Sequence, residues 1–287
     1  MNTIGTQTLG SSWRAKYFSS NLQTVLRKAL VCEKICQVDN SDLKYIHNPF
    51  TTQPTAAIQA VAGTYSVSAW SVTEDSLLVN DEVIYGGHIF QFEEIMNNFN
   101  LMAARMDEMA YSVAYGIDYF VLNNLCEDGT GTYTTPVGGF TTASNINEIM
   151  ANLISKVSGF QDVSNGMFLV IENTDMVGFV QAQATNGFSF ADMALKNGFM
   201  SSYMGVDIYV VRTGTFVTAT IGSTSVTNAS HRVFGVKNVA TYASPRGIQY
   251  DEKGVSGKTG KEVSAQGLVG FKLWTQKASL VIDITLA

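Results

Sequence analysis

The residues best suited to metal or nucleophilic chemistry are three cysteines and three histidines, and their spacing favours structural roles. Cys32 and Cys36 lie one helical turn apart, and His47 follows eleven residues later. A zinc site would need a fourth ligand at recognisable spacing, and no second Cys or His pair follows. We interpret the cysteine pair as small buried residues on one helix face and each histidine as a hydrogen-bonded structural residue. The other members of the set are Cys126, His88 and His231.

A second motif, Gly257-Lys258-Thr259, is similar to the end of a phosphate-binding loop. The full loop requires a glycine five residues before Gly257, a preceding apolar strand and a following helix. Position 252 is a glutamate and the flanking residues are typical of turns. We therefore predict a flexible hairpin tip carrying Lys253, Lys258 and Lys261.

Adjacent carboxylates are the third candidate chemistry. Neighbouring residues on a strand or helix point in different directions, so such pairs do not by themselves form an acid–base dyad. We interpret them as an acidic surface that is solvated or paired with basic partners. No dinucleotide-binding glycine motif, zinc signature or nucleophile elbow accompanies them, so we expect no enzyme, no cofactor and no metal. The pairs are Glu74/Asp75, Asp81/Glu82, Glu93/Glu94 and Asp107/Glu108.

Composition indicates a globular chain with large interfaces. Of the 287 residues, 15% are charged and 46% are hydrophobic, whereas about 25% charged residues is typical. Scarce charge is what a subunit with extensive protein contacts would show. The first eighteen residues lack a secretory pattern, and no apolar run approaches the roughly 18 residues of a membrane span. The odd number of cysteines indicates reduced thiols. We expect a soluble protein made inside a cell.

Charge is distributed unevenly along the chain. Residues 1–44 hold six Lys/Arg against three Asp/Glu, whereas residues 45–155 hold one against twelve. Residues 156–287 hold eleven against nine. The acidic middle block repels itself unless it meets basic surface within the chain or on a neighbouring copy. An acidic pI of about 5.1 argues against a dedicated nucleic-acid binder, which would have a basic face, and leaves open a weak local contact through the basic N-terminal arm.

The elements that would position these residues begin with an extended hairpin. Residues 45–90 have β composition, and a one-residue slip in the alternation of apolar residues before Trp70 indicates a β-bulge. Glu74-Asp75 is typical of a turn, which would make 77–85 the returning strand. A lone two-stranded ribbon is marginal in water, so this hairpin should rest on a partner.

One very long helix is the clearest element. Apolar residues recur every three or four positions from 92 to 125, and Gly129 ends the pattern. A second helix is predicted near 145–157, with Asn145 and Glu148 as a capping box. Further helices are expected from about 173 to 182 and over 190–196. Strands are predicted at 167–171, 206–211, 232–243, 248–250, 262–274 and 280–286, which together give an α+β fold.

The order of these elements is similar to that of the major capsid protein of tailed bacteriophages, the Hong Kong 97-like shell fold that encapsulins share. The segments that carry the resemblance are 167–175, 198–212, 231–243 and 267–274. These patterns of strands and turns cover nearly the whole chain, and it is their order that carries the likeness.

The resemblance implies five regions. Residues 1–44 would be an N-terminal arm, 45–90 an extended loop that lies across a neighbouring subunit, and 91–143 a peripheral domain containing the spine helix. Residues 144–230 would form the axial domain at five-fold and six-fold centres, and 231–287 closing strands shared by both domains. The implied function is assembly of an icosahedral shell around double-stranded phage DNA.

The resemblance also implies partners. Pentamers and hexamers of this chain would form the shell in the host cytoplasm, with separate scaffolding, portal and cement proteins, only weak non-specific contact with DNA, and no membrane. No lysine lies between Lys44 and Lys156, so a cross-link from a loop lysine is excluded and the shell should be non-covalent. Met1 favours a full precursor without a fused scaffold. The expected inter-subunit contacts are Arg14, Lys16, Arg27, Lys28, Trp70, Glu74, Asp75, Asp81, Glu82, Lys253, Lys258 and Lys261.

Three alternatives stay open at this point. An encapsulin-type compartment shares the fold but would package protein cargo through an inner-face groove. A tail or connector component of a phage would also be structural, but it would lack the long helix followed by an α/β region. A hydrolase would require a substrate pocket that holds a residue with a shifted pKa.

Overall fold

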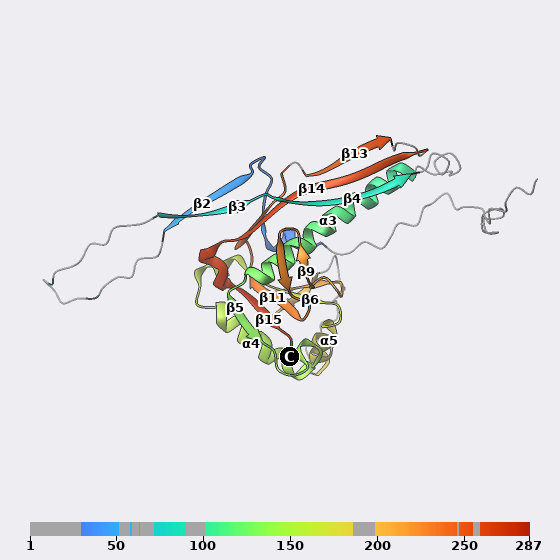
Figure 1. Cartoon of the computed structure of the whole chain (residues 1–287). Coiled ribbons are helices and arrows are strands. Elements are labelled where there is room, and N and C mark those ends of the chain that lie inside the picture. The colour runs from blue at the N-terminus through green and yellow to red at the C-terminus, as the bar shows by residue number, and fades with distance from the viewer. Residues whose placement is uncertain are drawn as a thin grey trace, which may run out of the picture.

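The α+β fold that the sequence predicts is present in a computed structural model of the chain. The structure describes residues 30–51, 58, 63, 72–89, 101–185, 199–245, 247–254 and 259–287. It contains a six-stranded sheet, a five-stranded sheet and two separate hairpins, with one long helix between the large sheets (Figure 1). Among the described helices, none combines the length and apolar character needed to cross a bilayer.

The long helix is α3, Leu101–Asp128. Its buried face repeats every three or four residues through Met109, Val113, Ile117 and Val121, so the predicted amphipathic pattern is confirmed. The helix ends one residue before Gly129, as expected. The first part of the predicted helix, 92–100, lies outside the described residues.

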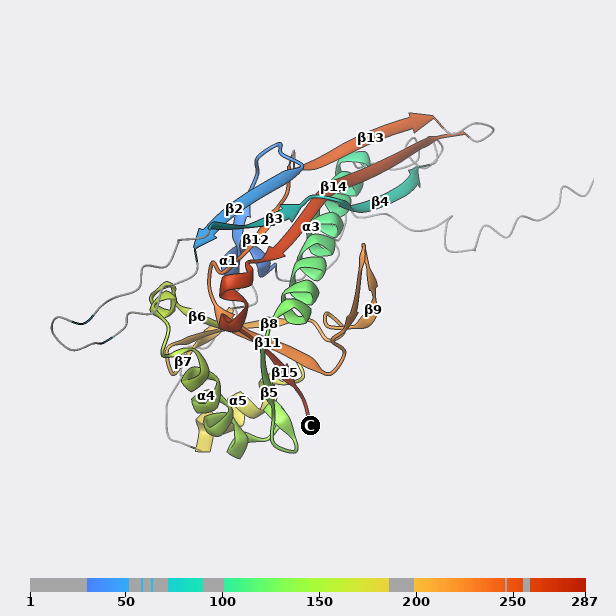
Figure 2. The ribbon, with the colours of Figure 1, turned by 60° about the vertical axis from the view of Figure 1, so that its left-hand side comes forward.

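The six-stranded sheet has the order β5-β15-β11-β6-β8-β7. Pairs β5/β15 and β6/β8 are parallel and the others antiparallel. Figures 1 and 2 show α3 on one side of this sheet and α4 and α5 on the other. The strands predicted at 167–171, 206–211 and 280–286 are confirmed. Their bounds are β5 Gly131–Thr134, β6 Met167–Glu172, β7 Phe199–Tyr203, β8 Val206–Val211, β11 His231–Val236 and β15 Val281–Thr285.

The five-stranded sheet is arranged around β14. This long strand pairs with β12 and β13 on one edge and β4 on the other, and β1 extends the sheet beyond β12. In Figures 1 and 2, β4, β13 and β14 form a long ribbon that runs beside α3. The bounds are β1 Gln37–Asp39, β4 Asp81–Ile89, β12 Ala240–Ala243, β13 Ile248–Gly254 and β14 Lys261–Leu273.

The single strand predicted over 232–243 is wrong, because this segment forms two strands in two sheets. Asn238 lies between β11 and β12 with a φ of 61°, a left-handed conformation that interrupts a strand. Its backbone N–H donates to the Ile35 carbonyl at 2.8 Å. The break therefore redirects the chain from the six-stranded sheet to the five-stranded one.

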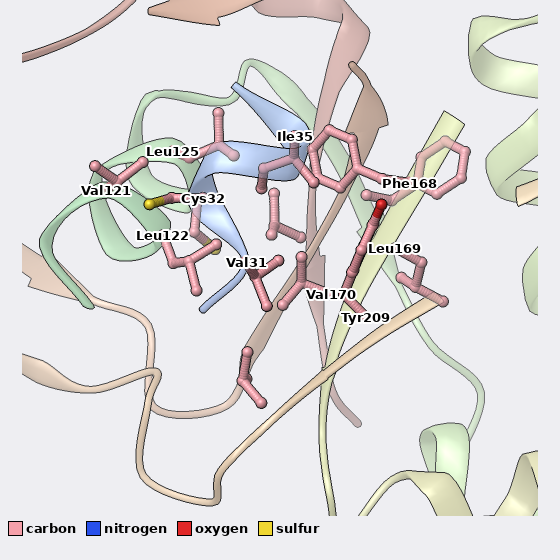
Figure 3. Close-up of a cluster of buried hydrophobic side chains, with 14 of the residues drawn as sticks. Val31, Cys32, Ile35, Val121, Leu122, Leu125, Phe168, Leu169, Val170 and Tyr209 are labelled. Carbon is pink, nitrogen blue, oxygen red and sulfur yellow. The ribbon is translucent and has the colours of Figure 1, made fainter. Parts of the chain in front are cut away.

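The N-terminal end of the described chain forms part of the core. Helix α1, Cys32–Ile35, is a single turn, and Cys36 ends it. Figure 3 shows Val31, Cys32 and Ile35 packed among side chains of α3, β6 and β8. Cys32 and Cys36 are buried free thiols, as predicted, but their predicted place on one helix face is wrong, because Cys36 follows the last residue of α1 and has an extended backbone.

The extended hairpin pairs β2, Tyr45–Thr51, with β3, Val72–Leu78. The predicted turn at Glu74-Asp75 is wrong, because both residues lie inside β3 opposite Pro49 and Asn48. The chain continues through Val79 and Asn80 into β4 without folding back. A smaller hairpin joins β9, Thr218–Ile221, to β10, Thr224–Thr227.

Helix α4, Ala143–Val157, and helix α5, Met176–Thr185, confirm two of the predicted helices. The predicted capping box is wrong, because α4 begins two residues before Asn145. Thr142 is the N-cap, and the Asn145 side chain donates instead to the Val137 carbonyl at 3.0 Å. The predicted helix at 190–196 lies outside the described residues. Short 3₁₀ turns are η1 Gly139–Thr141, η2 Gln161–Asn165 and η3 Thr275–Leu280.

Candidate functional site

The β2–β3 hairpin is largely exposed in the described part of the chain. Leu77 is its one fully buried residue, while Tyr45 and Val72 are 50% and 69% exposed. Figures 1 and 2 show the hairpin extending beyond the body of the molecule. Because a lone ribbon buries too little apolar surface to be stable, this hairpin depends on contacts beyond its own two strands.

Asp75 fastens the base of the hairpin to the C-terminal part of the chain. Its carboxylate accepts hydrogen bonds from the Thr275 backbone N–H at 3.0 Å and hydroxyl at 2.8 Å, and lies 3.3 Å from the Lys272 ammonium. Burial favours the neutral acid, but these donors outweigh it and lower the pKa of Asp75. Gln276 adds a bond to the Thr51 carbonyl at 2.8 Å.

Two of the other three acidic residues expected at subunit contacts, Glu74 and Asp81, also have partners within the chain. Glu74 forms an ion pair with His47 on the neighbouring strand, with both side chains more than half exposed. Asp81 is 9% exposed and accepts from the Ser223 N–H at 2.8 Å and the Ser223 hydroxyl at 3.2 Å. Glu82 is exposed on β4 opposite Leu268. Their role between subunits stays a prediction.

A hairpin is present at the predicted place as β13–β14, with Lys253 and Lys261 in its two strands, while the predicted flexibility of the tip stays a prediction. Lys253 pairs with Asp251 at 2.6 Å, and Lys261 pairs with Glu252 at 2.5 Å. The hydrogen bond between Lys253 and Asp251 lowers the pKa of Asp251 and raises the pKa of Lys253. The hairpin tip at 255–258 and the remaining expected contacts lie outside the described residues; these contacts are Arg14, Lys16, Arg27, Lys28, Trp70 and Lys258.

A buried charge cluster occupies the end of the six-stranded sheet. The Arg232 guanidinium donates to Asp175 at 2.5 Å and to Glu172 at 3.0 Å, and all three residues are at most 5% exposed. Glu172 also accepts from the Gly214 N–H at 2.9 Å. The arginine lies over the Phe216 ring. The cluster joins β6 and β11 to the 212–217 loop.

A second cluster lies beside the first. Asp283 Oδ1 is 3.2 Å from Cys126 Sγ, and both Asp283 oxygens are 2.8 Å from His231 Nδ1. Burial first, and then the Asp283 charge, raises the pKa of the Cys126 thiol. The structure therefore joins a thiol, an imidazole and a carboxylate, which the sequence shows only as isolated residues.

A pocket of about 480 Å³ lies between α3 and the β12–β13 connection, with Cys32, Glu33, Ile117, Tyr242 and Ile248 among its lining residues. Burial raises the pKa of Tyr242, and burial together with Asp118 raises that of Cys32. A raised pKa keeps a thiol protonated, and the thiolate is the nucleophilic form. The pocket therefore does not favour nucleophilic catalysis.

No family model and no curated protein matches the chain. Solved structures do. The capsid of cyanophage P-SCSP1u matches with a TM-score of 0.74 at 14% identity, over 96% of this chain and 94% of that one. A structure from Mycobacterium phage Che8 matches with a TM-score of 0.73 at 16% identity, over 96% of this chain and 97% of that one. The capsid of a native GTA particle matches with a TM-score of 0.73 at 14% identity, over 97% of both chains.

The chain has a phage-capsid fold. The matches extend over almost the entire length of both partners, so the capsid fold includes the hairpin, α3 and both large sheets. At these identities the matches establish architecture, and they confirm the fold class that the order of elements predicts.

Sequence reasoning missed both polar clusters of this capsid fold, the buried one and the partly buried one. The sequence did contain a signal for Arg232. This arginine directly precedes the buried run 233–236 in a predicted strand, and a buried arginine requires acidic partners. No local signal existed for the second cluster, since Cys126 and Asp283 are 157 positions apart. Only the packing of α3 on β11 and β15 brings these residues together.

Proposed function

We propose that this chain is a major capsid protein that self-assembles into the icosahedral shell of a tailed phage around double-stranded DNA. The match over nearly the full length of capsid chains carries this proposal. In support, burial raises the pKa of the Cys32 thiol in the described pocket, and a protonated thiol is a poor nucleophile. The proposed role is structural, and the proposed location is the virion, after assembly in the host cytoplasm.

Contacts between copies would be non-covalent. The exposed β2–β3 hairpin suits a surface that lies across a neighbouring copy, because its apolar residues Tyr45 and Val72 have little cover within the chain. Exposed apolar residues also occur near α4 and α5, including Val137, Phe160 and Val177. In the proposed shell, these residues would lie at contacts between copies around a symmetry axis.

The same proposal assigns the regions and the partners. Residues 1–44 form an arm, 45–90 the extended loop, 91–143 the peripheral domain and 144–230 the axial domain, and 231–287 supply strands to both. In support, β11 and β15 belong to one large sheet while β12, β13 and β14 belong to the other. Separate scaffolding, portal and cement proteins complete the particle, and the twelve contact residues named from the sequence act between copies.

Expression of the full chain followed by size exclusion and negative-stain electron microscopy tests the proposal. We expect closed shells, tubes or capsomer rings. Nucleic acid inside the closed shells would indicate a phage capsid. Because assembly of such shells can require a scaffold, the test includes co-expression with a candidate scaffolding protein. Monomers under both conditions contradict the proposal, and protein cargo in place of DNA supports an encapsulin-type compartment instead.

A further inference from the structure

Three chain segments meet at the cluster of Cys126, His231 and Asp283. Cys126 lies two residues before the end of α3, His231 begins β11, and Asp283 lies in the middle of β15. In the antiparallel register Asp283 is opposite Val233, so His231 is its diagonal neighbour on the same face of the sheet. The end of α3 covers this face and supplies the thiol.

The donor atoms are spaced almost as a metal ion would require. The ligand atoms of all three residues lie within 4.8 Å of one another. Zinc bonds of about 2.0–2.3 Å in tetrahedral geometry place neighbouring ligand atoms roughly 3.4–3.6 Å apart. The S–O distance is 3.2 Å and the N–O distance is 2.8 Å. The S–O pair would have to separate by roughly 0.2–0.4 Å and the N–O pair by roughly 0.6–0.8 Å to admit the ion.

The local charge also favours a cation. The nearest buried cation in the described chain is Arg232, which pairs with Glu172 and Asp175 on the opposite face of the sheet. Arg232 therefore does not neutralise Asp283. The hydrogen bonds described for the Asp283 carboxylate are those with the Cys126 thiol and the His231 imidazole. The His231 and Asp283 side chains are 24% and 20% exposed, which leaves access for an ion and a water ligand.

We propose that Cys126, His231 and Asp283 bind one Zn²⁺ ion, with water as its fourth ligand. A sulfur, a nitrogen and an oxygen donor together suit zinc, whereas Mg²⁺ and Ca²⁺ take oxygen ligands. The ion would tie the end of the long helix to two strands of the six-stranded sheet. The competing arrangement is a metal-free hydrogen-bonded triad with the same residues.

Metal binding by the purified full chain distinguishes these arrangements. Equilibrium dialysis against Zn²⁺, with metal quantified afterwards, should give about one ion per folded chain. Substitution with Co²⁺ should produce a thiolate-to-cobalt charge-transfer band and visible bands typical of tetrahedral cobalt. Cys126→Ser should remove the charge-transfer band and weaken zinc binding at least about tenfold. Asp283→Asn should weaken zinc binding by a similar factor.

Cys36→Ser is the matched control, because Cys36 is another buried free thiol and lies outside the cluster. This variant should keep the zinc stoichiometry and the cobalt spectrum of the parent. At the same zinc concentration, the unfolding temperature should rise in the parent and in Cys36→Ser, and should rise less in Cys126→Ser. Circular dichroism verifies folding of each variant, and Asp283→Asn supplies the test where Cys126→Ser does not fold. Absence of zinc from the folded parent, or unchanged binding in both cluster variants, overturns the proposal.

Discussion

The carboxylate of Asp118, in the middle of α3, accepts a hydrogen bond from the backbone N–H of Cys32 at 2.5 Å. The Val31 N–H donates to the same oxygen at 2.9 Å. Asp118 is 1% exposed, and burial raises the pKa of its carboxyl. The long helix thereby holds the point where the N-terminal segment enters the core, and the side chains in Figure 3 pack around that point.

Asp118→Ala should lower the free energy of unfolding by about 2–4 kcal/mol. The substitution leaves two buried N–H groups without an acceptor, and each unsatisfied group costs about 1–3 kcal/mol. Urea unfolding of the unassembled chain measures the change. The control, Glu148→Ala at an exposed position of α4, should stay within about 0.5 kcal/mol. Equal stability of the two variants would show that the Asp118 contact contributes nothing.

The Asp75 anchor should weaken in acid. Its folded-state pKa lies below the ordinary value of 3.8, so the folded chain binds this proton less tightly than the unfolded chain does. The contribution of Asp75 is therefore complete above the unfolded pKa and is lost as the pH falls through the folded pKa. The stability difference between the parent and Asp75→Asn should shrink between about pH 5 and pH 2. A difference independent of pH would refute this coupling.

Gly178 should not tolerate a side chain. A Cβ atom there would lie 1.9 Å from the Phe140 carbonyl oxygen, where α5 packs on η1. Gly178→Ala should destabilise the chain by about 1–3 kcal/mol or more, because backbone rather than a flexible side chain must move. Gly159→Ala is the matched control, since nothing lies within 4 Å of its added Cβ. Thermal unfolding of both variants decides the point, and a neutral Gly178→Ala would contradict this packing.

Arg232→Met should cost about 3–5 kcal/mol, since it leaves Glu172 and Asp175 as uncompensated buried charges. Adding Glu172→Gln and Asp175→Asn to that variant should recover part of the loss. The half-exposed pair of Lys277 and Asp162 offers a control, and Lys277→Met should cost at most about 1 kcal/mol. Chemical denaturation compares all three proteins, and equal effects of Arg232→Met and Lys277→Met would show that burial does not set the cost.

The elements predicted best are those whose own periodicity determines their burial. Val113, Ile117 and Val121 repeat at helical spacing and are buried on α3, and Ile282 and Ile284 alternate and are buried on β15. Such patterns are local, so the sequence alone reveals them. The order of these elements then predicted the capsid fold.

The wrong predictions arise where a distant contact overrides a local signal. Glu74-Asp75 has turn composition, but the bonds from Thr275 and Lys272 favour an extended conformation in β3. Asn145 has capping chemistry, but its amide binds the Val137 carbonyl. The group of Cys126 and Asp283 exists only after the sheet and α3 have packed, which no local pattern encodes.

Cryo-electron microscopy of particles assembled from this chain tests the proposed shell. We expect a closed icosahedral shell in which the six-stranded sheets surround five-fold and six-fold axes and the β2–β3 hairpin lies across a neighbouring copy. A particle without closed symmetry, or a hairpin that contacts only its own chain, would contradict it.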